Sequence, residues 1–218
     1  MASAMPGPRC ALRVSAGEFL ETLGIAEPYL DHEHDRCYCA ACYDGPDVID
    51  NEGPEPYVVP RGWYRFGVEL PKRAQDPKQK FFETWGASFH GVKSTNVLES
   101  ILTAQELQKP GDTLIDGTVL ESTKCAGRQD KVFYTSPTVR YAGLKFYAEP
   151  QRWRGDTMRA SIAMQCRQKP GSFRQQGQTM GFTPQGLREH RPHVEPRAVE
   201  WTSKVIDAAV PYGLLVRV

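Results

Sequence analysis

The alternation of apolar and polar positions predicts a chain built mainly of short β-strands. Aromatic residues stand in the runs 63–70 and the end of 80–92, and further runs typical of strands occupy 131–136, 158–168 and 210–218. Side chains in these runs suit a pleated surface that packs against a core. We therefore expect a strand in each of them.

Apolar residues return at helical spacing in three other segments. The first is 15–24, where Ser15 can act as N-cap. The second is 94–107, and the third is 136–150, where Pro137 would stand in the first turn. One helix followed by mostly short strands with brief helices, and without internal repeats, predicts an α+β fold rather than a doubly wound sheet.

The length of the chain suits one domain with a short appendage. The 218 residues, of which 40% are hydrophobic and 24% charged, can bury one core. We interpret residues 1–15, which are small and aperiodic, as a tail. Three parts are expected: a tail with a short helix over 1–30, a Cys- and His-rich lead-in over 31–60, and the main domain over 61–218.

The overall charge excludes a strong long-range attraction to nucleic acid or anionic lipid. The formal net charge is +1, from 27 basic and 26 acidic residues. No apolar stretch reaches the length of about 18 residues that a membrane helix needs, and the N-terminus lacks the apolar core of a signal peptide. We expect an intracellular protein, cytoplasmic or nuclear, without a membrane partner.

Basic residues are densest in the last third of the chain. They can contact an anionic substrate or form a solvated face. The residues are Arg167, Lys169, Arg174, Arg188, Arg191 and Arg197.

Three cysteines lie close together in the lead-in. Cys37, Cys39 and Cys42 form a C-x-C-x-x-C pattern in a run without a periodic apolar face. The other cysteines are isolated: Cys10, Cys125 and Cys166. Clustered thiols in a reducing cell indicate metal rather than disulfides. Thiolates and imidazoles are the ligands that zinc prefers, so we expect a small structural zinc knuckle.

The fourth ligand of this knuckle is open to several histidines. His34 is the nearest candidate, His32 is the next, and His190 or His193 could fold back from a distance. No Asp or Glu here is spaced as a base for metal-bound water, so a structural ion is favoured over a catalytic one. Reduced, uncoordinated thiols are the alternative.

Three separated segments carry the candidate chemistry. His90 and Gly91 stand at the end of a predicted strand, before a predicted helix, and Glu200 lies in a late segment beside Trp201. The middle segment carries Tyr134, Ser136, Thr138 and Tyr141. Taken singly, each segment has an ordinary structural interpretation: a turn, a core tyrosine pair and a surface charge beside a buried ring.

Taken in this order, the segments resemble the catalytic core of the poly(ADP-ribose) polymerase-like, or diphtheria-toxin-like, ADP-ribosyltransferases. The signature of that family is a His-Tyr-Glu triad, matched here by His90, Tyr134 and Glu200 over about residues 85–218. The flanks are also similar to transferase-like domains that a Cys-rich stretch precedes. The resemblance implies an α+β ADP-ribosyltransferase fold of split antiparallel β-sheets with short helices, preceded by the zinc knuckle.

The resemblance also implies a role for each matching residue. Glu200 would hydrogen-bond the 2′-hydroxyl of the nicotinamide ribose and stabilise the oxocarbenium-like transition state. His90 would hold the adenosine ribose, and the Gly91 backbone would receive the nicotinamide carboxamide. Glu189 and Glu195 are competing candidates for the position of Glu200.

The tyrosines and hydroxyl groups would form the nicotinamide pocket. Tyr141 would stack on the ring and Tyr134 would line the opposite wall. Ser136 or Thr138 would hydrogen-bond the amide. The spacing from Tyr134 to Tyr141 is shorter here than in the polymerases, which leaves the choice between the two hydroxyls open.

The function expected from the resemblance is NAD⁺-dependent ADP-ribosyl transfer with release of nicotinamide. Mono-ADP-ribosylation of a protein or nucleic-acid acceptor fits the short core. The main alternative is a catalytically inactive, zinc-stabilised interaction module of the same fold. An RNA 2′-phosphotransferase is disfavoured because that chemistry lacks a catalytic Glu, and metal-dependent hydrolysis is disfavoured because the cysteines leave no evident open position.

Overall fold

The protein is built around one antiparallel sheet of six strands. The computed structural model describes residues 10–25, 27–50, 55–76, 78, 80–121, 131–179, 194–205 and 207–218. The strands of the main sheet are β1 (Arg36–Cys37), β4 (Tyr64–Gly67), β11 (Ala209–Arg217), β8 (Met158–Gln168), β5 (Gly86–Val92) and β7 (Gln151–Trp153). They follow the order β1-β4-β11-β8-β5, with β7 paired to β8. β8 and β11 are the long central strands, so β1 and β5 lie at opposite edges.

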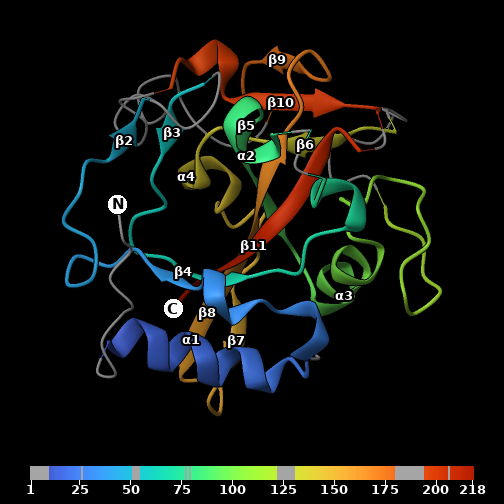
Figure 1. The fold of residues 1–218 in the computed structure, drawn as a ribbon. Helices are drawn as coiled ribbons and strands as arrows, with labels where there is room; N and C mark the ends of the chain where they lie inside the picture. The colour runs from blue at the N-terminus through green and yellow to red at the C-terminus, as the bar shows by residue number, and fades with distance from the viewer. Residues whose placement is uncertain are drawn as a thin grey trace.

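Two smaller antiparallel sheets accompany the main one. The three-stranded sheet contains β6 (Phe133–Thr135), β10 (Glu200–Ser203) and β9 (Arg174–Gln176), in the order β6-β10-β9. The two-stranded sheet pairs β2 (Val48–Ile49) with β3 (Tyr57–Val58). In Figure 1 both lie at the end of the molecule away from the N-terminal helix. The antiparallel sheets confirm the expected α+β class.

The helices are short and lie at the ends and faces of the sheets. They are α1 (Ala11–Thr22), α2 (Phe81–Thr84), α3 (Thr95–Ala104) and α4 (Val139–Ala142). Within the ranges that the structure covers, no helix has the length and apolar character needed to cross a bilayer.

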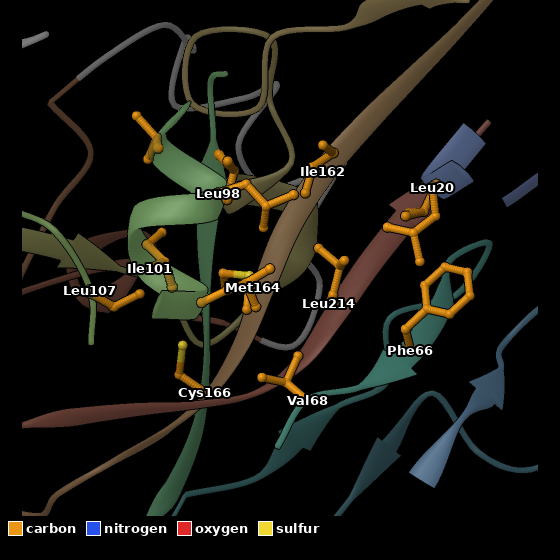
Figure 2. Packing of buried hydrophobic residues seen from close by; sticks show 14 of the residues in the cluster. Leu20, Phe66, Val68, Leu98, Ile101, Leu107, Ile162, Met164, Cys166 and Leu214 are labelled. Carbon is orange, nitrogen blue, oxygen red and sulfur yellow. The ribbon is translucent and has the colours of Figure 1, made fainter. Parts of the chain in front are cut away.

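The two faces of the main sheet bury separate apolar clusters. On one face, α1 and α3 pack side chains such as Leu20 and Leu98 against Met164 and Leu214 of the sheet (Figure 2). On the other face, Phe89 and other sheet residues pack against residues of β3 and α4. Because both faces are covered, the central strands are buried along most of their length, and this burial includes polar residues of β8 such as Gln165 and Arg167.

Several predicted boundaries need correction. The first helix begins at Ala11 with Cys10 as N-cap, so the interpretation of residues 1–15 as a tail was wrong for the described part. Cys10 and Leu12 pack against the core ahead of Ser15, so the helix begins before the Ser15 cap that the sequence favoured. The third helix is also shorter: it starts at Val139, with Thr138 as its cap, so that Pro137 precedes it.

The central strands and the second helix follow the prediction. β8 occupies Met158–Gln168, which is the predicted strand 158–168. β11 occupies nearly all of the last predicted strand. α3 lies within the predicted segment and begins at a serine cap, where the Ser94 hydroxyl accepts the Val97 N–H.

Candidate functional site

A backbone bridge between Phe89 and Ser136 joins the main sheet to the three-stranded sheet. Phe89 of β5 donates its N–H to the Ser136 carbonyl at 2.7 Å, and Ser136 returns a bond to the Phe89 carbonyl at 2.9 Å. β6, directly before Ser136, pairs on its other side with β10, where Thr202 faces Tyr134. The bridge therefore brings β5, β6 and β10 together, although they are far apart in the sequence.

A cavity of about 100 Å³ opens where these three strands meet. His90, Tyr134 and Glu200 all line it, which is the convergence that the motif order predicted. Other predicted residues in its wall are Gly91, Ser136 and Tyr141. Thr138 does not line the cavity, because its hydroxyl caps α4 by accepting the Arg140 N–H. We call this cavity the triad cleft.

The imidazole of His90 is fixed in one orientation. Its Nδ1 lies 2.7 Å from the Tyr134 carbonyl oxygen, and since a carbonyl can only accept, Nδ1 carries the proton and donates. Burial lowers the pKa of His90 below its usual value and outweighs the opposing effect of this hydrogen bond. The ring is therefore neutral at pH 7, and its Nε2 is left as a hydrogen-bond acceptor.

Gly91 permits a close approach of the chain that follows α4. A Cβ at this position would overlap the Ala142 carbonyl oxygen and would lie 2.7 Å from the backbone carbon of Tyr147. Glycine is thus required for packing between β5 and residues 142–147, whatever binds in the cleft. This contact holds the wall that carries Tyr141 and Tyr147 against the strand.

A pair of tyrosines forms that wall. The hydroxyls of Tyr141 and Tyr147 lie 2.8 Å apart, and their ring centroids are 5.1 Å apart. Burial, followed by the hydrogen bond to Tyr141, raises the pKa of Tyr147 above its usual range, so its hydroxyl remains protonated. Sequence analysis missed Tyr147, although it stands in the same segment as Tyr141 and only its spacing differs from the pattern sought.

The Glu200 carboxylate is buried and held by hydrogen bonds. The residue is only 1% exposed. Oε2 accepts the Thr179 N–H at 3.0 Å, and the Thr179 hydroxyl lies 2.7 Å from the same oxygen. Gln176 Nε2 donates to it at 3.4 Å. Nothing in the sequence pointed to Thr179, since its contact depends on how the chain returns after β9.

Glu195, one of the two competing glutamates, differs clearly from Glu200. Glu195 forms an ion pair with Arg197 at 2.8 Å, and its side chain is 67% exposed. Glu189 lies outside the described residues. Among the described candidates, Glu200 alone brings a buried carboxylate to the triad cleft.

Four cysteines gather at the other edge of the main sheet. The Sγ atoms of Cys10, Cys37, Cys39 and Cys42 all lie within 4.8 Å of one another. Cys10 Sγ is 3.4 Å from Cys37 Sγ and 3.7 Å from Cys39 Sγ. Zn–S bonds of about 2.3 Å in a tetrahedron would separate the sulfurs by about 3.8 Å. The cluster has the donor set and the size to bind a metal ion such as zinc.

Cys10 occupies the position that sequence analysis gave to a histidine. His34 is solvent-exposed, and its Nδ1 lies 2.8 Å from Asp31 Oδ2 instead of facing the cysteines. His32 contacts Asp35 and Glu27. His190 and His193 lie outside the described residues. The choice of His34 as fourth ligand is therefore corrected: Cys10 was overlooked because it was assigned to an aperiodic tail.

The thiols of the cluster influence one another even without an ion. Partial burial would raise the pKa of Cys39, but hydrogen bonds with the Cys37 and Cys42 thiols lower it to about 7. One thiolate can thus form near neutral pH, and thiolates are the form that binds metal.

The cysteine cluster is remote from the triad cleft within the main sheet. Cys37 belongs to β1 and His90 to β5, which are the two ends of the strand order. Four inter-strand spacings of about 4.8 Å separate these edges by about 19 Å. An ion held by the cysteines would therefore act on the fold and not on chemistry in the cleft.

A comparison with models of known protein families finds no match for this chain. The functional proposal below rests on the geometry of the cleft and of the cysteine cluster.

We predict that Cys10→Ser lowers the bound metal well below the about one equivalent expected of a four-cysteine site. The variant should also unfold at a lower temperature, because a ligand that binds only the folded state stabilises it. Metal content by mass spectrometry and thermal unfolding with and without a chelator measure both effects. The matched control is His34→Ala, which should keep its metal; loss of metal in this variant with full retention in Cys10→Ser would contradict the assignment.

We also predict opposite effects for two glycine substitutions. Gly91→Ala should destabilise the protein by about 1–3 kcal/mol, because the added methyl group overlaps the chain after α4. Gly17→Ala, in α1, meets no atom within 4 Å and should stabilise by up to about 1 kcal/mol through helix propensity. Urea unfolding of both variants compares them. Equal stability of wild type and Gly91→Ala would show that the approach of residues 142–147 is not as close as described.

Proposed function

We propose that this protein is an NAD⁺-dependent ADP-ribosyltransferase of the His-Tyr-Glu type. The observation that carries the proposal is that His90, Tyr134 and Glu200, from three separate segments, line one cavity. The family's order of motifs also agrees with the β-strands and helices on which these residues lie. The chemistry is the breaking of the glycosidic bond between nicotinamide and ribose.

His90 and its neighbours would bind the two ends of the dinucleotide. With Nδ1–H given to the Tyr134 carbonyl, Nε2 is free to accept a hydroxyl of the adenosine ribose. The Gly91 backbone would pair with the nicotinamide carboxamide at the edge strand, where no side chain stands between them. These interactions position the substrate and need no change of protonation.

The tyrosines would enclose the nicotinamide ring. Tyr141 is held by its hydroxyl bond to Tyr147, which fixes the ring plane before substrate arrives. Ser136 is the hydroxyl that lines the cleft, and we assign it the amide contact that sequence analysis left open between Ser136 and Thr138. Its Oγ already accepts the Thr138 N–H, so its own proton is free to be donated.

Glu200 would stabilise the transition state. As the C1′–N bond breaks, its electron pair leaves with nicotinamide, and positive charge develops on the ribose. A carboxylate that accepts the ribose 2′-hydroxyl lowers the energy of this cation. Oε1 accepts the Thr179 hydroxyl at 3.0 Å, and because a carboxylate oxygen can accept two bonds, the ribose hydroxyl would share this oxygen with Thr179. The acceptor then bonds to C1′ and releases its proton to solvent.

We assign the four-cysteine cluster to a structural zinc ion. Four thiolates complete a tetrahedral shell and leave no position for water or substrate. The ion would link the N-cap of α1 to β1 and the loop after it. This linkage replaces the packing that an aperiodic segment cannot provide.

The acceptor is proposed to be a protein or nucleic-acid group that receives a single ADP-ribose. The alternative is an inactive interaction module of the same fold. One observation favours the alternative: the Glu200 carboxylate already has partners in Thr179 and Gln176, which a substrate must share or displace.

We predict that Glu200→Gln lowers single-turnover transfer from labelled NAD⁺ by about 10²–10³-fold, because one electrostatic stabiliser of the transition state is lost. Calorimetry should show that this variant still binds NAD⁺, since its shape and its hydrogen-bonding positions remain. The test uses the protein itself, a lysate and a nucleic-acid mixture as acceptors.

Glu195→Gln is the matched control, because Glu195 is exposed and lies on the same segment as Glu200. It should transfer ADP-ribose at the wild-type rate. Binding of NAD⁺ without transfer by the wild type would favour the interaction module. Absence of both, or equal transfer by wild type and Glu200→Gln, would contradict the catalytic proposal.

A further inference from the structure

A second cavity, of about 190 Å³, lies against the opposite half of the main sheet from the triad cleft. Its wall comes from the Cys-rich segment, the central strands and α2, and it shares no residue with the wall of the triad cleft. Three guanidinium groups line it: Arg36 of β1, Arg65 of β4 and Arg167 of β8. We call it the arginine pocket.

Two of these arginines oppose each other directly across neighbouring strands. Arg36 pairs with Arg65 in the register of β1 and β4. Side chains at directly opposite positions share a face of the sheet, and like charges placed there repel each other. An anion bound between the two guanidiniums would offset this unfavourable pairing.

Aromatic rings separate and orient the three guanidiniums. The Cζ atoms of Arg36 and Arg65 lie 5.3 and 6.0 Å from the ring centroid of Tyr38. Those of Arg65 and Arg167 lie 5.6 and 5.7 Å from the ring of Tyr212. Arg167 also lies 5.3 Å from the ring of Phe82. Cations and rings thus alternate across four strands and α2, and the rings hold the cations without neutralising their charge.

The hydrogen-bond acceptors of Arg65 are neutral, although the Asp35 carboxylate, which is not part of the pocket wall, also acts on it electrostatically. Its Nη2 and Nε donate to the His34 carbonyl at 2.9 and 3.2 Å, and Nη1 lies 3.5 Å from Gln165 Oε1. Among the described wall residues Asp31 is the single acid, and its Oδ2 lies 2.8 Å from His34 Nδ1. The pocket therefore combines an excess of positive charge with donors fixed by neutral acceptors.

We propose that the arginine pocket binds the phosphate group of a small molecule. A phosphate presents several acceptor oxygens and up to two negative charges, so it can contact more than one guanidinium at once. A carboxylate is planar and singly charged, and one arginine already satisfies it. The proposal is independent of the ADP-ribosyltransferase proposal, since it uses no residue of the triad cleft.

The cysteine cluster supports the arrangement of this pocket. Arg36 and Tyr38 stand on either side of Cys37, so their backbone positions follow from the geometry of the cluster. Metal bound there fixes one wall before the phosphate enters. Removal of the metal should therefore weaken phosphate binding.

The test is a titration of the whole protein with inorganic phosphate at constant ionic strength, followed by ¹H–¹⁵N spectra of the arginine Nε–Hε groups. Saturable shifts with one dissociation constant are expected at Arg36, Arg65 and Arg167. Acetate in place of phosphate should not reproduce them. A parallel titration with AMP distinguishes the source: tighter binding of AMP identifies a nucleotide phosphate, and equal binding identifies phosphate alone.

Two variants decide whether the shifts arise in the pocket. Arg65→Gln should weaken phosphate binding by about tenfold or more, as expected for the loss of one charge-assisted hydrogen bond. Arg36→Gln, at the edge of the sheet, tests the same point if Arg65→Gln fails to fold. Arg159→Gln, exposed on β8, is the control and should bind as wild type does. Shifts that do not saturate, that acetate reproduces, or that are equal in all variants would overturn the proposal.

Discussion

The exchange of two backbone hydrogen bonds between Phe89 and Ser136 is the interaction on which the arrangement of the cleft depends. Among the described residues it is an isolated bridge, since the strands of each sheet there pair with other strands of the same sheet. Because β6 continues from this bridge and pairs with β10, it fixes the position of Glu200 relative to His90. The side-chain bond from His90 to the Tyr134 carbonyl spans the same junction. Three far-separated parts of the chain thus form one wall.

The cysteine cluster has a corresponding role at the opposite edge of the main sheet. Cys10 caps α1, whose Phe19 and Leu20 pack into the core, and Cys37 belongs to β1. A metal ion there would order an aperiodic segment at a free-energy gain on the order of 10 kcal/mol. The same segment supplies Arg36 and Tyr38 to the arginine pocket. The edge that a metal ion would stabilise and the edge that carries the triad therefore each contain a candidate binding site.

The sequence predicted what depends on local pattern and missed what depends on long-range pairing. The strands β8 and β11 and the helix α3 were predictable because their patterns of apolar residues act over a few positions. The convergence of His90, Tyr134 and Glu200 was expected because the order of the motifs resembles that of a known family. The spacing of the residues alone did not predict it. The spacing of the cysteines could not identify Cys10 as a ligand. Cys10 lies beside the other three only because α1 packs where it does. Thr179 likewise contacts Glu200 only because of the path of the chain after β9. The pairing of Arg36 with Arg65 can be recognised only once the strand register is known.

The proposed function requires that the triad cleft bind NAD⁺ with its nicotinamide end against β5. A crystal structure with carba-NAD⁺, whose nicotinamide–ribose linkage cannot be cleaved, tests it most directly. We expect the carboxamide at the Gly91 backbone, the pyridine ring on Tyr141 and the adenosine ribose at Nε2 of His90. A dinucleotide bound elsewhere, including in the arginine pocket, or a cleft without ligand at saturating concentration, would contradict the account.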